Sequence, residues 1–485
     1  MNEAIRNLQP KEIWNNFADL NAVPRPSKKE ERVIAFMKAF GEKLNLETIV
    51  DHIGNVIIRK PATPGMENRK AVVLQSHLDM VHQKNNDTDF DFNTQGIEMY
   101  VDGDWVRARG TTLGADNGLG VATIMAILQS DSLPHPDIEA LFTIDEETGM
   151  TGAMELKGGL LKGEILLNLD TEEDDEIGVG CAGGVDITAT RAYDEVPAEG
   201  DLGFTLKIKG LQGGHSGMDI IKGLGNANKL MNRMLFSTSG LMNIVSIKGG
   251  SLRNAIPRES EATVVVKKDN KDAFLKELNT IKQSILEEYK LLEPDLKIMF
   301  EEGDKAEKMM PGEVQQLFLN CMQAAHNGVF RMSPAMEGLV ETSNNIAKVT
   351  VGAGEITVEC LTRSSVESSK MNLADSLKAC FELGGFEVSF SGEYPGWAPN
   401  MDSPILKVLD SLYKELNGEE AHVAACHAGL ECGILGQNYP GMDMISFGPT
   451  IKGAHSPDER ASISSTQKFW EFIKEILKNT PEKTA

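Results

Sequence analysis

Four short, nearly continuous apolar runs stand out at the two ends of the chain. They cover residues 71–76, 139–144, 164–169 and 443–447. Runs of this length and composition are typical of strands buried on both faces of a parallel sheet. Helical spacing is found at about 10–44 and 119–128, and a pair of strands is predicted at 46–50 and 55–59. The pattern therefore predicts an α/β domain at the two ends of the chain.

The middle of the chain, from about 186 to 400, has a different pattern. Its first half predicts strands at 204–209, 243–247, 261–266 and 295–300 and helices at 218–236 and 271–289. This β-α-β-β-α-β order is that of a ferredoxin-like unit. A looser copy follows, with helices at 312–325 and 368–383 and strands at 346–350, 355–362 and 386–391. We predict an inserted α+β domain of two such units at 186–400, with 1–185 and 401–485 forming the other domain and a hinge at 395–399.

Composition and charge narrow the class of protein. At 485 residues the chain is long enough for two domains, and its hydrophobic (41%) and charged (25%) contents are those of a soluble globular protein. The formal charge of −24 argues against nucleic-acid or anionic-membrane partners, which require basic surfaces. We expect no membrane span and no signal peptide. The six scattered cysteines predict reduced thiols and a cytoplasmic location.

Residues of the types that can bind metals or transfer protons follow each apolar run. They are His77 and Asp79, Glu146 and Glu147, Asp170, and, beyond the fourth run, His455; Asp116 lies between two glycines where a helix begins. Ligands of open α/β sheets bind beyond the carboxyl ends of the strands, so we expect these side chains to meet. Each also has a simpler interpretation: Asp116 as a helix cap or turn residue, His77 and Asp79 as a hydrogen-bonded pair, 145–147 and 171–176 as solvated loops, and His455 as a turn residue.

This set of side chains suits a two-metal hydrolytic site. Imidazole and carboxylate ligands bind zinc, and also manganese or cobalt. Five ligands that include one bridging carboxylate would hold two cations about 3.5–4 Å apart and activate a water molecule. A nearby carboxylate that binds neither cation would act as the base. The spacing does not show which of Glu146 and Glu147 has that role.

Five short motifs resemble those of the di-zinc peptidase family of aminoacylases, carboxypeptidases and carnosinases. They are H-L-D at 77–79, G-A-D-N-G at 114–118, E-E-T-G at 146–149, L-D-T at 169–171 and A-H-S-P-D at 454–458. Stretches at 109–114, 180–184, 213–217, 252–259 and 427–433 support the resemblance, which runs nearly end to end. It implies a phosphorylase/hydrolase-like α/β catalytic domain that binds two zinc ions (manganese or cobalt being possible), with the inserted α+β domain as a lid.

The resemblance also implies a role for each residue. Asp116 would bridge both metals, His77 and Asp170 would complete one metal's ligands, and Glu147 and His455 the other's. Asp79 would orient His77, and Glu146 would be the general base. Four further residues would bind substrate: His215 at the oxyanion, Asn254 and Arg363 at the backbone and C-terminal carboxylate, and Glu431. The alternatives are a turn histidine at 215 and a solvated arginine at 363.

The activity that this resemblance implies is hydrolysis of dipeptides with a free N-terminus. The similarity is strongest to family members that cleave aminoacyl-histidine dipeptides, so Xaa-His substrates, including β-alanyl-histidine, are expected. One alternative keeps the metals but makes the chain an N-acyl-amino-acid deacylase. Another is a non-catalytic metal-binding protein on the same fold, which the presence of Glu146 disfavours. A homodimer through the lid is one expectation, and the alternative is a monomer in which the doubled lid takes the place of a partner's lid.

Overall fold

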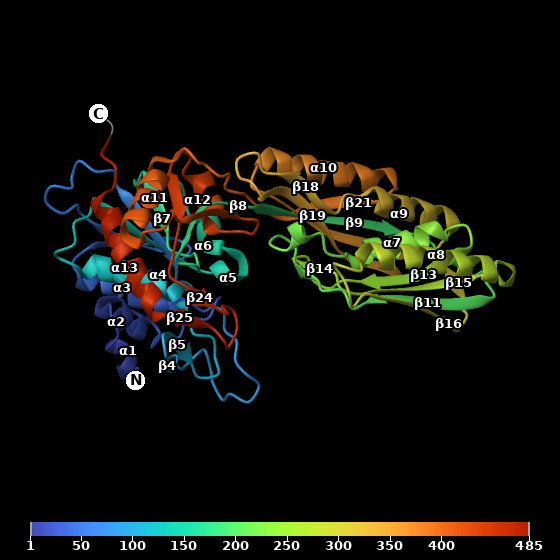
Figure 1. Cartoon of the computed structure of the whole chain (residues 1–485), viewed down its shortest axis with the longest axis horizontal. Coiled ribbons are helices and arrows are strands. Elements are labelled where there is room, and N and C mark those ends of the chain that lie inside the picture. Colours follow the sequence, from blue (N-terminus) through green and yellow to red (C-terminus); the bar gives the residue numbers. More distant parts are fainter. Residues whose placement is uncertain (1, 484–485) are drawn as a thin grey trace. The chain divides into compact units, whose positions relative to one another are not determined.

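The chain forms two structural units, and it passes from the first unit into the second and back again twice (Figure 1). The computed structural model describes residues 2–483. Unit 1 comprises Met1–Gly180, Pro399–Ala425 and Leu430–Ala485, and unit 2 comprises Cys181–Ala398 and Cys426–Gly429. No helix in the described part of the chain is long and apolar enough to cross a membrane.

Unit 1 is built around an eight-stranded mixed sheet in the order β1-β2-β6-β3-β7-β23-β8-β22. Its central strands run parallel and are β6 (Ile138–Thr143), β3 (Val72–His77), β7 (Ile165–Asn168) and β23 (Asp443–Ser446). These strands are the four apolar runs of the sequence, and nearly all of their residues are buried. Their carboxyl ends therefore share one edge of the sheet, which confirms the predicted α/β class. The outer strands are β1 (Glu47–Val50), β2 (Val56–Lys60), β8 (Glu176–Cys181) and β22 (His422–Cys426).

One helix of unit 1, α4 (Ala115–Gln129), is apolar on all sides and almost completely buried. It packs against α2 and against strand β3, so no face of it is left for solvent. Because the helix begins at the edge where the parallel strands end, its first turn presents Asp116 to that edge. The other helices of unit 1 are α1 (Glu3–Arg6), α2 (Lys11–Leu20), α3 (Glu31–Lys43), α5 (Glu146–Gly149), α6 (Thr151–Glu155), α11 (Pro404–Asn417), α12 (Glu431–Asn438) and α13 (Ile463–Lys478).

A small antiparallel sheet in unit 1 has no counterpart in the predicted elements. It contains β4 (Met99–Asp102), β5 (Trp105–Ala108), β24 (Ile451–Lys452) and β25 (Arg460–Ser462), in the order β24-β25-β5-β4. Pairing of β25 with β5 fixes the C-terminal segment beside residues 105–107. The segment that carries His455 lies between β24 and β25, so this sheet anchors it at both ends.

Unit 2 contains a nine-stranded antiparallel sheet, in which two ferredoxin-like halves supply eight strands and the ninth, β18 (Gly328–Met332), pairs with β19. The first half is β11 (Leu202–Lys209), α7 (Ala227–Ser237), β13 (Met242–Gly249), β15 (Ser260–Val266), α8 (Lys271–Tyr289) and β16 (Lys297–Gly303). The second is β9 (Gly183–Ala192), α9 (Gly312–Ala324), β19 (Val340–Gly352), β20 (Glu355–Ser364), α10 (Glu367–Leu383) and β21 (Glu387–Tyr394). Both have the spatial strand order fourth, first, third, second, and pairing of β13 with β19 joins them. The prediction of a doubled α+β domain is therefore confirmed, with the first half inserted after the first strand of the second.

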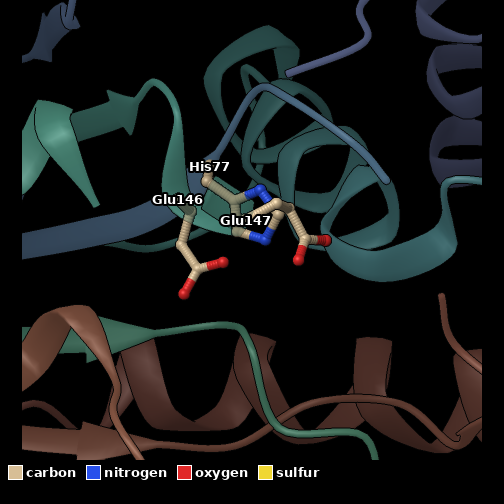
Figure 2. Close-up of side chains that lie close together, drawn as sticks. All are labelled: His77, Glu146 and Glu147. Atoms are coloured by element: carbon tan, nitrogen blue, oxygen red, sulfur yellow. The ribbon is translucent and has the colours of Figure 1, made fainter. Parts of the chain in front are cut away.

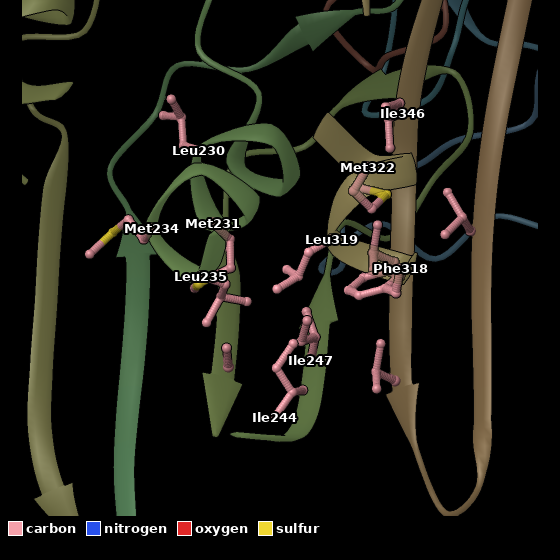
Figure 3. Packing of buried hydrophobic residues seen from close by; sticks show 14 of the residues in the cluster. Leu230, Met231, Met234, Leu235, Ile244, Ile247, Phe318, Leu319, Met322 and Ile346 are labelled. Atoms are coloured by element: carbon pink, nitrogen blue, oxygen red, sulfur yellow. The ribbon is translucent and has the colours of Figure 1, made fainter. Parts of the chain in front are cut away.

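The helices of unit 2 bury their apolar faces against this sheet. Figure 3 shows side chains of α7 and α9 packed together over β13 and β19. Shorter elements complete the unit: β10 (Val196–Pro197), β12 (Gly214–His215), β14 (Ala255–Ile256), β17 (Lys308–Met309), β18 (Gly328–Met332), and the 3-10 turns at Ile220–Lys222 and Lys268–Asn270.

The predicted helix at 218–236 is wrong over its first nine residues, 218–226. Helix α7 begins only at Ala227, because the Asn226 side chain caps it by accepting N–H bonds from Asn228 and Lys229. Gly223, with φ of 68°, ends the preceding 3-10 turn. The 3-10 turn at Ile220–Lys222 and helix α7 are therefore separate elements, joined by a glycine-containing segment.

Candidate active site

The carboxyl ends of the parallel strands bring two acidic residues to one face of His77. This histidine is the last residue of β3 and is fully buried. Its Nε2 atom lies 3.2 Å from Asp116 Oδ1 and 3.5 Å from Asp170 Oδ1. Asp170 comes shortly after β7, and Asp116 lies in the first turn of α4. Three different elements thus contribute one donor atom each to the same point.

A second group of donors lies on the other side of Asp116. His455 Nε2 is 3.2 Å from Asp116 Oδ2 and 3.0 Å from Glu147 Oε2. His455 has a left-handed backbone with φ of 64°, in the turn between β24 and β25. The two carboxylate oxygens of Asp116 therefore face two different histidines.

These donors fit a pair of divalent cations. Ligand atoms 2.0–2.2 Å from a tetrahedral zinc ion lie about 3.3–3.6 Å from one another. The separations of 3.0–3.5 Å observed here are close to that spacing. Glu147 Oε1 is also buried without a hydrogen-bond partner among the described atoms. The groups His77, Asp116, Asp170 and Asp116, Glu147, His455 could each hold one cation, with Asp116 shared.

The carboxylates of the site favour positively charged groups next to them, either protonated histidines or bound cations. Burial alone would lower the pKa of His77, but the carboxylates of Asp170 and Asp116 raise it well above its usual value. Hydrogen bonds to Asp116 and Glu147 raise the pKa of His455 to about 11. Burial raises the pKa of Asp170 to about 6, and nearby Asp116 adds to this. A buried cluster of this kind is more stable when cations neutralise its carboxylates.

Asp79 fixes both the histidine and the adjacent glutamates. Its Oδ1 atom lies 3.3 Å from His77 Nδ1, so Nε2 is directed toward the metal donors. The same carboxylate accepts the backbone N–H groups of Glu146 (3.0 Å) and Glu147 (3.2 Å) and the hydroxyl of Ser27 (2.8 Å). One buried carboxylate thus holds the ends of β3 and β6 in register. Ser27 could not be predicted as part of the site from the sequence.

Glu146 and Glu147 leave the chain in different directions from neighbouring positions of α5. Figure 2 shows their carboxylates on either side of the His77 ring. Glu147 reaches His455, whereas Glu146 has no ion pair with a histidine, lysine or arginine among the described residues. Burial raises the pKa of Glu146 well above its usual value, and the neighbouring carboxylates of Asp170 and Glu431 contribute. A carboxyl group in this position, with a raised pKa and no basic partner among the described residues, is suited to accept a proton.

Two further glutamates lie near the metal donors. Glu431, the first residue of α12, is fully buried, and its Oε2 atom accepts hydrogen bonds from Gln75 (2.6 Å) and Thr143 (2.7 Å). Its Oε1 atom has no partner among the described atoms, and burial raises its pKa to about 7. Glu172 lies in the run predicted to be a solvated loop, but burial, with Asp116 and Asp170, raises its pKa to about 8. Glu172 is half-buried, as are most residues of the run 171–176.

In unit 2, the backbone fixes the tautomer of His215. Its Nδ1 atom accepts the N–H groups of Gly217 (3.2 Å) and Met218 (3.0 Å). Burial, with the Arg363 charge nearby, lowers the pKa of His215. The neutral ring must therefore carry its proton on Nε2, which makes that atom a hydrogen-bond donor.

Arg363 of β20 is buried without a carboxylate within 4 Å among the described residues. Its Nε donates to Ser216 Oγ (3.3 Å) and its Nη1 to Tyr394 Oη (2.9 Å). A buried guanidinium with neutral partners can receive an anion such as a carboxylate. The solvated alternative for Arg363 is therefore wrong. Asn254 is exposed, and its carbonyl accepts the N–H of Ser216.

His427 is a buried residue of unit 2 that the sequence interpretation did not select. Its Nε2 lies 2.7 Å from Ser343 Oγ, and its Nδ1 has no partner among the described atoms. Burial, together with Arg363 and His215, lowers its pKa to about 3. Only its position in the stretch 427–433 could have indicated it, because its partner Ser343 is far away in sequence.

Comparison with known proteins decides the family. The sequence model of peptidase family M20/M25/M40 matches residues 73–479. The chain belongs to this peptidase family. The resemblance predicted from the motifs is thus confirmed. This peptidase is 42% identical to the cytosol non-specific dipeptidase of Escherichia coli (strain K12) over 480 residues, which cover 98% of this chain and 99% of that protein.

Solved structures agree with this assignment. The crystal structure of aminoacylhistidine dipeptidase from Vibrio alginolyticus superposes with a TM-score of 0.94 at 44% identity and covers 99% of both chains. The aminopeptidase PepT from Bacillus cereus shares the fold, with a TM-score of 0.57 at 15% identity over 97% of this chain and 98% of its own.

Proposed function

We propose that this peptidase is a metal-dependent dipeptidase acting on dipeptides with a free N-terminus, Xaa-His and β-alanyl-histidine included. The observation that carries the proposal is the position of Asp116 between His77 and His455. Glu146 lies nearby and, within the described part of the chain, forms no ion pair with either histidine. The names of the two relatives, at 42% and 44% identity, support the substrate class.

We assign one cation to His77 and Asp170, a second to Glu147 and His455, and both to Asp116. Zinc suits these ligands, and manganese or cobalt would also bind. When bound, two such cations polarise the scissile carbonyl and lower the pKa of the attacking water. Asp79 holds His77 with Nε2 toward the cations.

Glu146 is the proposed general base. Its carboxylate would take the proton of the attacking water and then pass that proton to the leaving amine. Burial raises the pKa of Glu146 well above its usual value, so its carboxylate holds a proton more strongly than an exposed glutamate does.

Unit 2 supplies the proposed substrate contacts. The Nε2–H of His215 would donate to the oxyanion, and Arg363 would bind the terminal carboxylate. Asn254 is exposed and would bind the substrate backbone. Glu431 is fully buried, so we propose that it supports β3 and β6 through Gln75 and Thr143 rather than contacting substrate.

Hydrolysis of alanyl-histidine against its N-acetyl form tests the proposal. The metal-free protein is supplied in turn with zinc, manganese or cobalt, and released histidine is measured. The free dipeptide should be cleaved and the acetylated form should not. Cleavage of N-acetyl amino acids in preference would favour the deacylase, and absence of turnover with every metal would favour a non-catalytic protein.

The role of His215 can be tested separately. His215→Ala should lower kcat more than it raises KM, because a bond to the oxyanion forms mainly in the transition state. His326→Ala is a matched control, since His326 is also a half-buried histidine of unit 2 with a lowered pKa. Equal kcat values for the two variants would leave His215 as a turn residue.

We further propose a cytoplasmic location and a homodimer formed through unit 2. The location is supported by the name of the Escherichia coli relative. Sedimentation velocity of the full chain measures the oligomeric state, and a single species of about 53 kDa would exclude the dimer.

A further inference from the structure

Glu459 makes an unusual set of contacts beside the proposed metal site. This buried carboxylate accepts four consecutive backbone N–H groups. Its Oε2 atom receives those of Leu113 (2.7 Å) and Gly114 (2.9 Å), and its Oε1 atom those of Ala115 (2.8 Å) and Asp116 (3.2 Å). The N–H groups of the loop that leads into the regular part of helix α4 are thus satisfied by a carboxylate from a distant segment.

The carbonyl side of the same loop is held by a second buried charge. Arg25 Nη2 donates to the Gly114 carbonyl (2.5 Å), and Arg25 Nη1 donates to the carbonyls of Leu78 (3.1 Å) and Asp79 (3.0 Å). Arg25 therefore ties the loop of Asp116 to the chain just after His77. Glu459 therefore binds the N–H groups of the loop that carries Asp116, and Arg25 binds a carbonyl group of the same loop.

Glu459 also links two proposed ligands directly. It lies four residues after His455, in a turn where its N–H bonds to the Ser456 carbonyl (3.0 Å). One short segment thus carries the His455 ring and the group that holds the Asp116 backbone. The distance of 3.2 Å between Asp116 Oδ2 and His455 Nε2 therefore depends on the position of the His455 ring and on the Asp116 backbone that Glu459 holds.

We propose that Glu459 is a positioning residue that holds the Asp116 carboxylate between His77 and His455, so that both metals can share it. The inference rests on the proposed metal-dependent function. It predicts that Glu459 acts on metal affinity through the backbone, without touching metal or substrate.

The test is metal affinity in Glu459→Gln. Four N–H groups need two acceptor atoms, and an amide offers only one; its NH₂ would face two further donors. The loop should shift, and the affinity for metal should fall about 10–100-fold, the usual effect of losing a group that orients a ligand. Competition with a chromogenic chelator measures the affinity, and elemental analysis measures the stoichiometry.

Glu139→Gln is the matched control. Glu139 is a buried carboxylate of unit 1 whose Oε2 atom accepts the N–H groups of Lys162 (2.6 Å) and Gly163 (2.9 Å), in a loop that carries no proposed ligand. It should lose stability without losing metal affinity. Failure of the wild-type chain to bind two metals would contradict the proposed function, whereas equal affinity of wild type and Glu459→Gln would contradict only the role of Glu459.

Hydrogen exchange gives a result that does not require the variant to fold. In the metal-free wild type, the amides of residues 113–116 should exchange slowly, because each donates to a buried carboxylate. Exchange of these four amides at the rate of an open loop would overturn the proposal.

A separate observation in unit 2 concerns two cysteines on neighbouring helices. Cys321 of α9 and Cys380 of α10 are free thiols whose sulfurs each lie against the other residue's backbone. Cys321 Sγ is 3.3 Å from the Cys380 carbonyl oxygen, and Cys380 Sγ is 3.6 Å from the Cys321 carbonyl oxygen. Gly384 leaves room for this arrangement, because a Cβ there would lie 2.3 Å from Cys321 Sγ.

The two thiols differ in reactivity. The neighbouring Cys321 thiol lowers the pKa of Cys380 to about 7, and the Lys229 ammonium contributes, although burial opposes both. The same interaction between the two thiols raises the pKa of Cys321. Cys380 is only partly buried, whereas Cys321 is buried. An accessible thiolate next to a second thiol is the arrangement found in thiols that oxidise reversibly.

We infer that Cys321 and Cys380 are an oxidation site that forms a disulfide with low-molecular-weight disulfides such as oxidised glutathione. The Cys380 thiolate attacks one sulfur of the oxidant and releases one glutathione thiolate, which leaves a mixed disulfide. The Cys321 thiol then gives its proton to the released glutathione thiolate and attacks Cys380 Sγ, which breaks the mixed disulfide and releases the second glutathione as a thiolate. Two protein thiols are oxidised, and one external disulfide is reduced to two thiols.

Peptide mass spectrometry after treatment of the full chain with oxidised glutathione tests this site. A Cys321–Cys380 linked peptide should form, and Cys321→Ser should instead retain glutathione on Cys380. Cys360→Ser is the control, because burial raises the pKa of the Cys360 thiol to about 12 and it should not take part. A stable glutathione adduct on Cys380 with Cys321 present, or no reaction at either residue, would overturn the inference.

Discussion

At the scale of single residues, Asp79 connects the parts of the proposed chemistry. It holds the His77 ring through Nδ1 and the backbone of Glu146 and Glu147 through their N–H groups. Adjacent glutamates fixed in this way point in different directions, one toward His455 and one not. Two residues of the same type can therefore have different roles.

This difference gives a prediction for two conservative variants. Glu146→Gln should bind two metals and dipeptide but turn over about 10²- to 10⁴-fold more slowly, because only the base is lost. Glu147→Gln should lose metal first and recover part of its activity at high metal concentration. Metal content and kcat, measured side by side, check this. A metal-poor Glu146→Gln with a metal-replete Glu147→Gln would show that the two roles are reversed.

His427 gives a pH prediction at the same scale. Its pKa is lowered from 6.5 to about 3, so its ring should stay neutral at pH 5. The unfolded chain binds this proton below pH 6.5 and the folded chain only near pH 3, so protonation favours unfolding as pH falls through that range. In NMR spectra of protein with ¹³C-labelled histidine, the resonance that His427→Asn removes should not titrate above pH 4.5. A midpoint near 6.5 would contradict the burial argument.

At the scale of elements, the position of helix α4 depends on one glycine. A Cβ at Gly120 would lie 2.4 Å from Ser76 Oγ and 2.7 Å from the Leu169 carbonyl oxygen, so the helix touches both β3 and the end of β7. Only a glycine permits this approach, which also brings Asp116 to the strand ends.

Gly120→Ala should therefore destabilise unit 1 by about 1–3 kcal/mol, the usual cost of overpacking. Gly436→Ala in α12 is the matched control, because its nearest neighbour is the flexible end of Met444. That variant should be neutral or stabilised by up to about 1 kcal/mol through helix propensity. Thermal unfolding checks both, and an unchanged Tm for Gly120→Ala would contradict the close approach.

The sequence predicted the central strands well because parallel strands buried on both faces need continuous apolar runs. It did not predict β9 as the first strand of the second ferredoxin-like half, because more than 100 residues separate β9 from α9. The crossing at Cys426–Gly429 was also missed, since four residues carry no periodic pattern. Both features depend on pairing between distant segments.

The proposed site divides in the same way. His77, Asp116 and His455 stood out because each lies at a strand end or in a glycine-rich motif. Arg25, Glu459 and Ser343 did not, because they act on partners far away in sequence and have no local pattern of their own. Sequence motifs therefore indicate the groups that face the metals, and the structure adds the groups that hold them.

At the scale of the whole molecule, we expect the activity of this acidic chain to depend on bound cations. Its formal charge of −24 includes a buried cluster of carboxylates, in which burial raises the pKa of Glu146 and of Asp170. Two cations would neutralise that cluster, and each would share Asp116.

The most direct test measures the rate of alanyl-histidine hydrolysis as zinc is added to the metal-free chain. The account predicts negligible activity without metal and a rise that reaches its plateau at two equivalents per chain. In Asp116→Ala, which loses the shared ligand, two equivalents should restore almost no activity. Full activity in the presence of excess chelator, or a plateau at one equivalent in the wild-type chain, would contradict the two-metal account.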